Sequence, residues 1–491
     1  MRYAKINVKS NHFLFLTSFE SPLNKGASEG VWKYRGLRIM AISDKYKGKY
    51  VFHFTDLRNL DSIVKNSLLS TNEKKRLGIK HHNIANQTIQ ARRDEMDVTV
   101  GPGGKVHDYV PFYFSSINPM LLSLLNHKNC DQNLIIYLCI YIERLDKDDA
   151  VFTNASANTT SPPTFYDDTS HLDELDWDLI LSRKWKMDSD EAKHKKMAEA
   201  LIHTKVDICE INAIVVYNEG VKEKVEKVFK QNGLKAPDIL FDHDYKIRKY
   251  GFYYTKFFFD SRKNETLVIG PQTLLHAYKK ILKQVKDVRR INKKEYQYKT
   301  IGELVEALNQ DINCLPEMRD AVKISQNYPP HNDTVGEHTQ KVVAEIRKCN
   351  YYKNASSQVQ NVLLLGAYLH DMGKGPASKW KNGQMKSAYL DHPADAIPML
   401  KRILTEEIKS VSDDEIRRLC MLVVYHDIIG DCLLKEREKQ QIADIIENED
   451  DYDMLSAISI ADSTSINDAW GRMISKNAPD MKAEVMNLKH G

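Results

Sequence analysis

The sequence contains few cysteines and no closely spaced pair of them. Its 491 residues include seven, and no two form a CxxC motif. A disulfide framework or a Cys-based zinc site is therefore not expected. Reduced thiols in a cytoplasmic protein are the simplest interpretation. The cysteines stand at positions 130, 139, 209, 314, 349, 420 and 432.

Long apolar runs are also missing. The longest ones, such as Leu134–Ile142 and Ile211–Tyr217, have the length of a β-strand. A membrane-spanning helix needs about 18 or more apolar residues in a row, and the mean hydropathy is −0.49. The first residues, MRYAKINVKSNHF, lack the apolar core of a secretory signal. We therefore expect neither a membrane span nor export.

The charge of the chain is nearly balanced. Lys and Arg number 71 against 67 Asp and Glu, so the formal net charge is +4. This weak basicity permits a nucleic-acid partner without requiring one. The hydrophobic share of 42% and charged share of 28% are typical of globular proteins. At roughly 150 residues per domain, the length predicts two to four domains.

The chain divides into differently patterned parts. Strand-like runs such as Tyr50–Thr55 and Val110–Phe114 alternate with helical spacing over Leu57–Leu69. Further on, apolar residues recur at helical spacing in 302–309, 334–349, 356–371, 394–409, 413–428, 436–448 and 453–470. We predict four parts: an N-terminal extension with strand-like patches (1–48), an α+β domain (49–262), a basic linker (263–300) and an all-α domain (301–491).

The basic linker has two interpretations. Lys279–Lys299 carries repeated Lys and Arg residues on a segment with helical spacing. A solvated linker helix is the simpler interpretation, because charge runs are usually solvated. The alternative is a patch that follows a phosphate backbone.

The helical part contains an ordered series of histidines and aspartates. A single His on an apolar helix is more often a core or surface residue than a ligand, but a whole series in this order is much less expected by chance. Imidazole and carboxylate ligands together suit Mn, Mg, Fe, Co, Ni or Zn, and the spacing does not select among these metals. A buried Asp needs a partner, which a divalent cation would supply. The series is His338, His370, Asp371, His392, His426 and Asp462.

This series resembles the H…HD…H…H…D pattern of the HD-domain metal-dependent phosphohydrolases, over residues 311–470. The stretch LPEMRDAVKISQNYPPHNDTVGEHT is similar to the HD domains attached to CCA-adding tRNA nucleotidyltransferases, although the DxD of a nucleotidyltransferase is missing. The resemblance implies hydrolysis of a phosphate ester without naming the substrate. It also implies residue roles: core metal ligands at His338, His370, Asp371 and Asp462, second-metal or phosphate ligands at His392 and His426, and a phosphate contact at Lys374.

Three segments of the first half carry a second set of polar residues. They are KYVFHFTDLRNLDSIVKNSLLS, IQARRDEMDVTVGPGGKVHDYVPFYFSSINPML and LDWDLILSRKWKMDSDEAKHKKMAEALI. Each is weak alone, because a strand His, an Arg doublet or a carboxylate is usually structural. In this order they resemble the DarT-type ADP-ribosyltransferase toxins, which modify bases of single-stranded DNA, over about residues 49–260.

The DarT resemblance implies that NAD is a substrate. It assigns NAD contacts to His53, Thr55 and Tyr113, the last within the Tyr109–Phe114 strand. Either Arg92 or Arg93 is implied as the catalytic arginine, and the doublet leaves the choice open. Glu199 is implied as the catalytic glutamate. Positive charge develops on the ribose as nicotinamide leaves, and a carboxylate stabilises such charge or accepts a proton.

The two resemblances together predict a bifunctional enzyme. An NAD-dependent ADP-ribosyltransferase of the toxin or phage-defence type is joined to an HD phosphohydrolase that uses a divalent metal. The expected partners are single-stranded DNA and an antitoxin or ADP-ribose-removing protein, with no membrane. One alternative is an RNA-directed transferase whose HD half processes RNA ends. Another is that the HD half is a non-catalytic nucleotide or metal sensor that regulates the transferase.

Overall fold

The computed structural model describes residues 42–82, 87–158, 162–241, 257–258, 268–291 and 295–490. The residues Ala41–Gly491 form one compact unit. The strand-like patches predicted within the N-terminal extension, at residues 13–15 and 37–42, lie outside the described residues, except for Ile42. Within the described ranges, no helix has both the length and the apolar character needed to cross a membrane.

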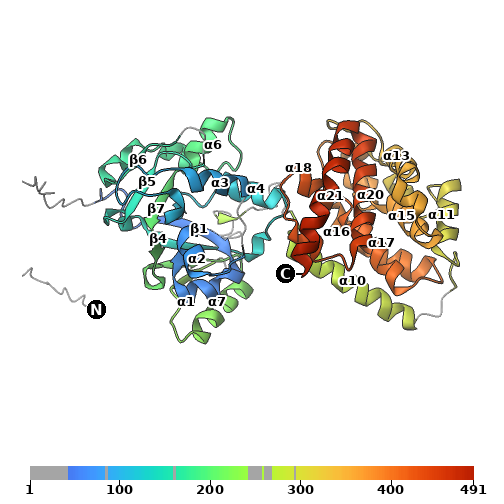
Figure 1. The fold of residues 1–491 in the computed structure, drawn as a ribbon, viewed down its shortest axis with the longest axis horizontal. Helices are drawn as coiled ribbons and strands as arrows, with labels where there is room; N and C mark the ends of the chain where they lie inside the picture. Colours follow the sequence, from blue (N-terminus) through green and yellow to red (C-terminus); the bar gives the residue numbers. More distant parts are fainter. Residues whose placement is uncertain are drawn as a thin grey trace, which may run out of the picture. The chain divides into compact units, whose positions relative to one another are not determined.

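A mixed sheet organises the first half of the described chain (Figure 1). Its strands follow the order β10-β9-β4-β1-β3-β7-β5-β6, and all neighbours are antiparallel except β9 and β10. The four segments predicted as strands are confirmed, with ends shifted by one or two residues. The strands are β1 (Tyr50–Asp56), β3 (Tyr109–Tyr113), β4 (Ile135–Tyr141), β5 (Ala150–Thr153), β6 (Phe165–Tyr166), β7 (Glu199–His203), β9 (Ala213–Val215) and β10 (Asp238–Leu240).

Short helices surround this sheet. The predicted helix Leu57–Leu69 is confirmed only in its middle, because Ser67 takes a left-handed φ of 72° and the chain then enters β2 (Leu68–Leu69), which pairs with β8 (Lys205–Val206). The helices are α1 (Leu60–Asn66), α2 (Thr71–Leu77), α3 (Gln87–Glu95), α4 (Pro119–Asn126), α5 (Trp177–Ile180), α6 (Asp190–Lys196) and α7 (Glu219–Gln231).

Both faces of the sheet are buried, as its central strands require. Successive side chains of a strand point to opposite faces, so Val51 packs in one core with Phe112, whereas its neighbour Phe52 packs in a second core with Tyr137. Two-sided burial explains why β4 reads as an unbroken apolar run. The sheet is thus a rigid base for the polar side chains of β1, β3 and β7.

The second half is helical, as predicted. One apolar core is shared by its helices, and α20 and α21 run side by side (Figure 1). A two-residue strand pair, β11 (Ser325–Gln326) with β12 (Gln384–Met385), is an addition to the predicted all-α pattern. The helices are α10 (Pro271–Ile291), α11 (Ile301–Gln310), α12 (Pro316–Ala321), α13 (Val335–Lys348), α14 (Asn350–Asn354), α15 (Ser357–Leu369), α16 (His392–Arg402), α17 (Asp413–Tyr425), α18 (Ile428–Leu434), α19 (Gln440–Ala443), α20 (Glu449–Ile466) and α21 (Asp468–His490).

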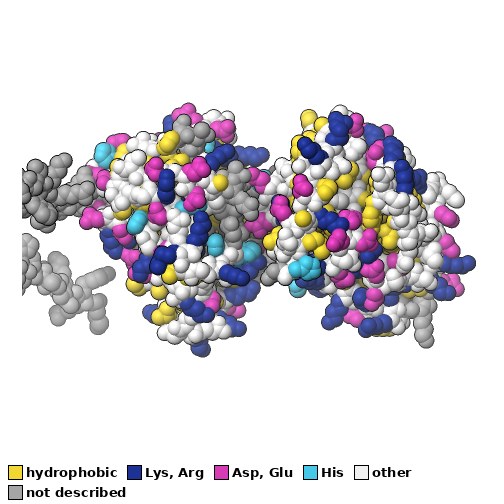
Figure 2. Space-filling model, in the orientation of Figure 1, with side chains coloured by type: hydrophobic (Ala, Val, Ile, Leu, Met, Phe, Trp, Pro, Cys, Tyr) yellow, Lys and Arg dark blue, Asp and Glu magenta, His cyan; other side chains and the backbone are white. Residues whose placement is uncertain are grey.

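Helix α10 occupies most of the segment predicted as a basic linker. Its residues Leu274, Tyr278, Ile281 and Val285 are buried in the core of the helical half. These positions are three or four residues apart, so one face of the helix is apolar and the lysines occupy the rest. The helix is therefore built into the second half on one side and solvated on the other. In the view of Figure 2, basic and acidic side chains are interspersed on the surface.

Candidate functional sites

A cavity of about 520 Å³ lies where β1 and β3 meet α2 and α3. Among the residues that line it are His53, Thr55, Arg93 and Tyr113. These residues come from three elements that are separate in the sequence: β1 carries His53 and Thr55, α3 carries Arg93, and β3 carries Tyr113. Tyr113 pairs with Phe52 on one side and with Glu199 on the other, because β3 lies between β1 and β7. The sheet thus brings the predicted NAD contacts and the predicted catalytic glutamate together.

Glu199 is the first residue of β7 and has no exposed surface. Its Oε1 accepts hydrogen bonds from Arg93 Nη1 at 2.9 Å and from the backbone N–H of Ala157 at 2.9 Å. Its Oε2 is buried and has no hydrogen-bond partner among the described residues. A buried carboxylate oxygen without a donor is costly. Glu199 is not itself part of the described cavity lining, whereas its partner Arg93 is.

The two arginines of the doublet have different surroundings. Arg93 is buried, lines the cavity and forms an ion pair with Glu199. Burial lowers the pKa of Arg93, but the attraction of Glu199 outweighs it and raises the pKa overall. Arg92 is exposed and does not belong to the cavity lining. The geometry therefore favours Arg93 as the functional arginine.

His53 is held as a neutral imidazole. Burial lowers its pKa to about 4, and its Nδ1 lies 2.8 Å from the carbonyl oxygen of Pro111. Because a carbonyl only accepts, Nδ1 carries the hydrogen and Nε2 keeps its lone pair. Nε2 can therefore accept a hydrogen bond from a sugar hydroxyl. Thr55 is buried beside Asn59, whose side-chain amide donates to Thr55 Oγ1 at 3.1 Å.

Lys74 is a cavity residue that the sequence interpretation missed. It lies on α2 and lines the cavity with Arg93, and burial lowers its pKa. A lysine in a concave, partly apolar site is suited to an anionic group such as a pyrophosphate. The run Lys74-Lys75-Arg76 was the available signal, but a basic run on a short helix is usually solvated.

Comparison with known proteins identifies this region. Residues 52–246 match the family described as ssDNA thymidine ADP-ribosyltransferase, DarT. A DNA ADP-ribosyl transferase of Thermus sp. (strain 2.9) is 33% identical over 187 residues, which are 37% of this chain and 87% of that protein. The chain belongs to the DarT family. A DNA ADP-ribosyl transferase of Escherichia coli O127:H6 is 33% identical over 161 residues, which are 30% of this chain and 72% of that protein.

Solved DarT structures are also similar to this chain. Thermus sp. 2.9 DarT in complex with ADP-ribosylated ssDNA has 30% sequence identity and a TM-score of 0.37, covering 40% of this chain and 95% of that chain. The same protein in complex with NAD+ has 28% identity and a TM-score of 0.35, covering 40% of this chain and 96% of that chain. The DarT region of this chain contains His53, Arg93, Tyr113 and Glu199.

Conservative replacement of each arginine will show which one acts in the DarT site. We expect Arg93→Lys to reduce ADP-ribosyl transfer by roughly 100-fold, because Lys cannot reproduce the fork of a guanidinium and leaves Glu199 without its fixed partner. Arg92→Lys is the matched control, and we expect it to stay within about twofold of wild type, as for an exposed residue. The measurement is the initial rate of label transfer from NAD. A larger loss in Arg92→Lys than in Arg93→Lys would reverse the assignment.

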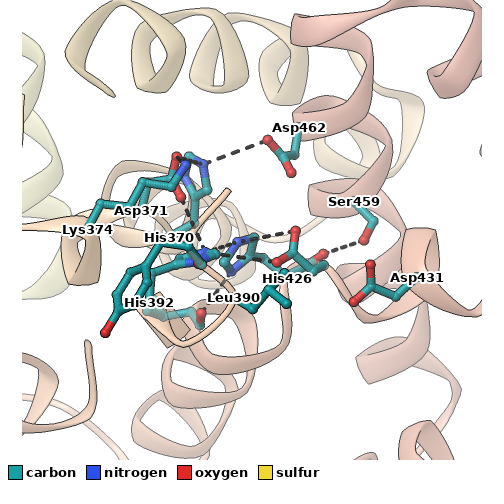
Figure 3. A network of polar contacts seen from close by, with 12 residues as sticks. His370, Asp371, Lys374, Leu390, His392, His426, Asp431, Ser459 and Asp462 are labelled. Carbon is teal, nitrogen blue, oxygen red and sulfur yellow. Dashed lines mark hydrogen bonds and ion pairs between the residues drawn. The ribbon is translucent and has the colours of Figure 1, made fainter. Parts of the chain in front are cut away.

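A second site lies in the helical half, where His370, His392 and His426 gather around Asp371 (Figure 3). His338 Nε2 and His370 Nε2 are 3.2 Å apart, and His392 Nε2 and His426 Nε2 are 3.1 Å apart. Asp462 Oδ1 lies 2.9 Å from His338 Nε2. The helices α13, α15, α16, α17 and α20 supply or precede these residues, so all six members of the predicted series meet at one place.

The other ring nitrogens of these histidines point outward. His370 Nδ1, His392 Nδ1 and His426 Nδ1 lie 2.8, 2.6 and 2.9 Å from backbone carbonyl oxygens, and His338 Nδ1 lies 3.0 Å from Ser465 Oγ. A carbonyl holds the hydrogen on Nδ1, so the Nε2 lone pairs face inward. Outer contacts of this kind orient histidines that bind metals. Inward lone pairs 3.1 to 3.2 Å apart repel unless a proton or a cation lies between them.

Asp371 links the two histidine pairs. Its Oδ2 lies 3.4 Å from His338 Nε2 and 3.3 Å from His370 Nε2, and its Oδ1 lies 3.4 Å from His392 Nε2. Lys374 is buried beside it, with Nζ 2.6 Å from Asp371 Oδ2. Burial alone would lower the pKa of His370, but Asp371 and Asp462 raise it to about 9. The two carboxylates thus favour positive charge at this place.

Asp427 is a member of this site that the sequence interpretation missed. Its Oδ1 lies 3.5 Å from His426 Nε2, and the set His426, Asp427 and Asp462 places its ligand atoms within 4.8 Å of one another. Two further sets, His338-His370-Asp371 and Asp371-His392-His426, share Asp371. The signal was present, because His426-Asp427 is a second His-Asp pair after an apolar helix.

The site opens into a cavity of about 410 Å³. The cavity lining includes Lys374, Tyr328 and His331 beside the metal-type ligands.

The segment HDMGK requires glycine at position 373. A Cβ at this position would meet the carbonyl oxygen of His392 at 1.9 Å. Only glycine allows the turn after Asp371 to approach the start of α16 so closely.

Proposed function

We propose that the DarT region, residues 49–262, transfers ADP-ribose from NAD to a thymidine base of single-stranded DNA. Membership of the DarT family supports this proposal. The observation that carries it is the buried Glu199, which accepts a hydrogen bond from Arg93 and has one oxygen without a donor among the described residues. A neutral His53 and a cavity large enough for a dinucleotide fragment lie beside that pair.

The positive charge that develops on the ribose during transfer explains the arrangement of this site. The bond between nicotinamide and ribose C1′ breaks, and a bond forms between C1′ and a nitrogen of the base. Nicotinamide leaves as a neutral molecule, and the proton of the base nitrogen passes to Glu199. The Glu199 carboxylate also stabilises positive charge on the ribose. Arg93 fixes the carboxylate, and His53 Nε2 accepts from a ribose hydroxyl. A base must leave its stack to reach C1′, which favours single strands.

Mass spectrometry of the acceptor tests the transferase proposal directly. We expect the full-length protein with NAD to add one ADP-ribose to thymidine-containing single-stranded DNA. Duplex DNA and thymidine-free oligonucleotides are the matched controls, and RNA of the same sequence tests the RNA-directed alternative. Preferential modification of RNA would replace DNA as the substrate. Intact NAD with no modified acceptor would reject transfer altogether.

We propose that the helical half, α10 included, is an HD-type phosphohydrolase that uses one or two divalent metal ions. The observation that supports this proposal is the convergence of four inward Nε2 atoms on the carboxylates of Asp371, Asp427 and Asp462. The ligand set fits Mn, Mg, Fe, Co, Ni or Zn. His338, His370, Asp371 and Asp462 would hold one ion. His392, His426, Asp427 and the shared Asp371 would hold a second.

Beside the metal-type ligands, the site has a lysine and an open cavity that suit a phosphate ester. Such metals, when bound, activate water and polarise a phosphoryl oxygen. Lys374 positions Asp371 and presents an ammonium to the cavity, where it can contact a phosphate oxygen. The open cavity beside the ligands favours an enzyme over a closed structural metal site, because catalytic sites keep a position for substrate.

A further inference from the structure

The lysine at position 128 belongs to the DarT region but lines the cavity of the helical half. It follows α4 and has a left-handed φ of 54°, which non-glycine residues adopt only when their surroundings hold them there. Hydrogen bonds between residues 128–129 and residues 436–441 hold it there. Asn129 donates to Glu436 O at 2.9 Å and accepts from the Glu438 N–H at 2.9 Å. Gln441 Nε2 donates to Lys128 O at 2.8 Å.

The ammonium of Lys128 is buried and almost unpartnered. The residue is 5% exposed, and the hydrogen bond recorded for Nζ within the described ranges is to Leu390 O, at 2.5 Å. No carboxylate of the described residues forms an ion pair with it. The other two lysines of this cavity differ, because Lys374 pairs with Asp371 at 2.6 Å and Lys435 with Asp431 at 2.9 Å. Two of the three N–H donors of Lys128 therefore remain unused.

A buried cation without a counter-charge is unfavourable. The acidic groups that act on Lys128 already have other partners. Asp391 accepts from the Ile269 N–H, Asp427 lies against His426, and Asp431 pairs with Lys435. Burial accordingly lowers the pKa of Lys128, with Arg437 acting in the same direction. An anion that enters the cavity would supply both the missing charge and the missing acceptors.

We propose that Lys128 binds a phosphate group of the ligand in the second cavity, so that the DarT region supplies a substrate-binding residue to the helical half. This inference rests on the proposed phosphohydrolase function. A charge-assisted hydrogen bond from an ammonium suits a phosphate oxygen. Helix α4, which leads to Lys128, also lines the first cavity through Met120 and Leu124. The short helix α4 therefore connects Lys128 to the lining of the first cavity.

The test uses the manganese-loaded full-length protein with inorganic phosphate as the probe. Calorimetry measures phosphate binding, and p-nitrophenyl phosphate gives kcat and KM. We expect Lys128→Met to weaken phosphate binding and to raise KM by roughly tenfold, as for loss of a hydrogen bond to a charged group. We expect kcat to stay within about twofold, because Lys128 lies outside the metal-type ligand set. Lys128→Arg, which keeps the charge, should retain most of the binding.

Asn129→Ala is the matched control, because Asn129 joins the same two regions without lining the cavity. Phosphate affinity unchanged in Asn129→Ala but reduced in Lys128→Met, at equal melting temperature, supports direct contact. Equal loss in both variants would assign Lys128 a merely structural role and overturn the inference. Unchanged affinity in Lys128→Met would also overturn it, while the phosphohydrolase proposal stands. If the wild type neither binds phosphate nor hydrolyses the ester, that proposal fails and the inference with it.

Discussion

Glu199→Gln is expected to reduce ADP-ribosyl transfer by about 100- to 1,000-fold while NAD binding is kept. Removal of one preorganised group that stabilises transition-state charge has an effect of this size. Gln is isosteric, and its carbonyl oxygen can still accept from Arg93 Nη1, which is 2.9 Å from Glu199 Oε1. What is lost is the negative charge beside the ribose and the ability to accept a proton. The measurements are initial rates of labelling and calorimetric titration with NAD.

The choice of Gln over Ala matters for this experiment. Glu199→Ala would leave the buried Arg93 guanidinium without a partner, and breaking a buried ion pair in this way costs about 3–5 kcal/mol of stability. A loss of activity in that variant would not separate catalysis from folding. Glu191→Gln is the matched control, because Glu191 lies on α6 with 78% of its side chain exposed. Transfer at the wild-type rate in Glu199→Gln would contradict the proposed role.

Alternation predicted the strands that carry His53 and Tyr113, whereas the roles of His53, Tyr113 and Glu199 rest on the DarT resemblance and stay predictions. The register that brings Tyr113 beside Glu199 comes from the pairing of β3 with β7, which the local pattern of either segment does not give. The Arg92–Arg93 doublet was undecidable from sequence, since both residues lie on a nine-residue helix whose orientation depends on tertiary contacts. Lys74 was missed for the same reason.

In the helical half, the candidate ligands were predicted better than the bounds of the helices. The His and Asp residues were predicted from their order, and the structure brings them together. Helix boundaries were less accurate: the predicted segment 436–448 forms only the short α19 at Gln440–Ala443. Asp427 was missed although it repeats the pattern of Asp371, because an exposed-looking Asp after a helix has many roles. The place of Lys128 depends on contacts between residues about 300 positions apart, which periodicity does not reveal.

Asp371→Asn is expected to have the largest effect in the helical half. Asp371 belongs to two of the three metal-type ligand sets, so its amide substitute weakens both. Loss of an outer-shell partner alone reduces metal affinity about 10- to 100-fold, so loss of a shared ligand should reduce it at least roughly 100-fold. Phosphate release should vanish at micromolar metal. Metal content after dialysis and phosphate release across Mn, Co, Ni and Mg are the measurements.

Thermal stability gives this prediction a readout that does not depend on the substrate. A metal that binds only the folded state stabilises it by RT ln(1 + [metal]/Kd). At a manganese concentration between the two dissociation constants, wild type should therefore be stabilised and Asp371→Asn left almost unchanged. Asp413→Asn is the matched control, because Asp413 is 72% exposed at the start of α17. The four inward Nε2 atoms are present in all three proteins. If manganese stabilises Asp371→Asn as much as wild type, the remaining ligands hold the ion without it, and the shared carboxylate is not a ligand.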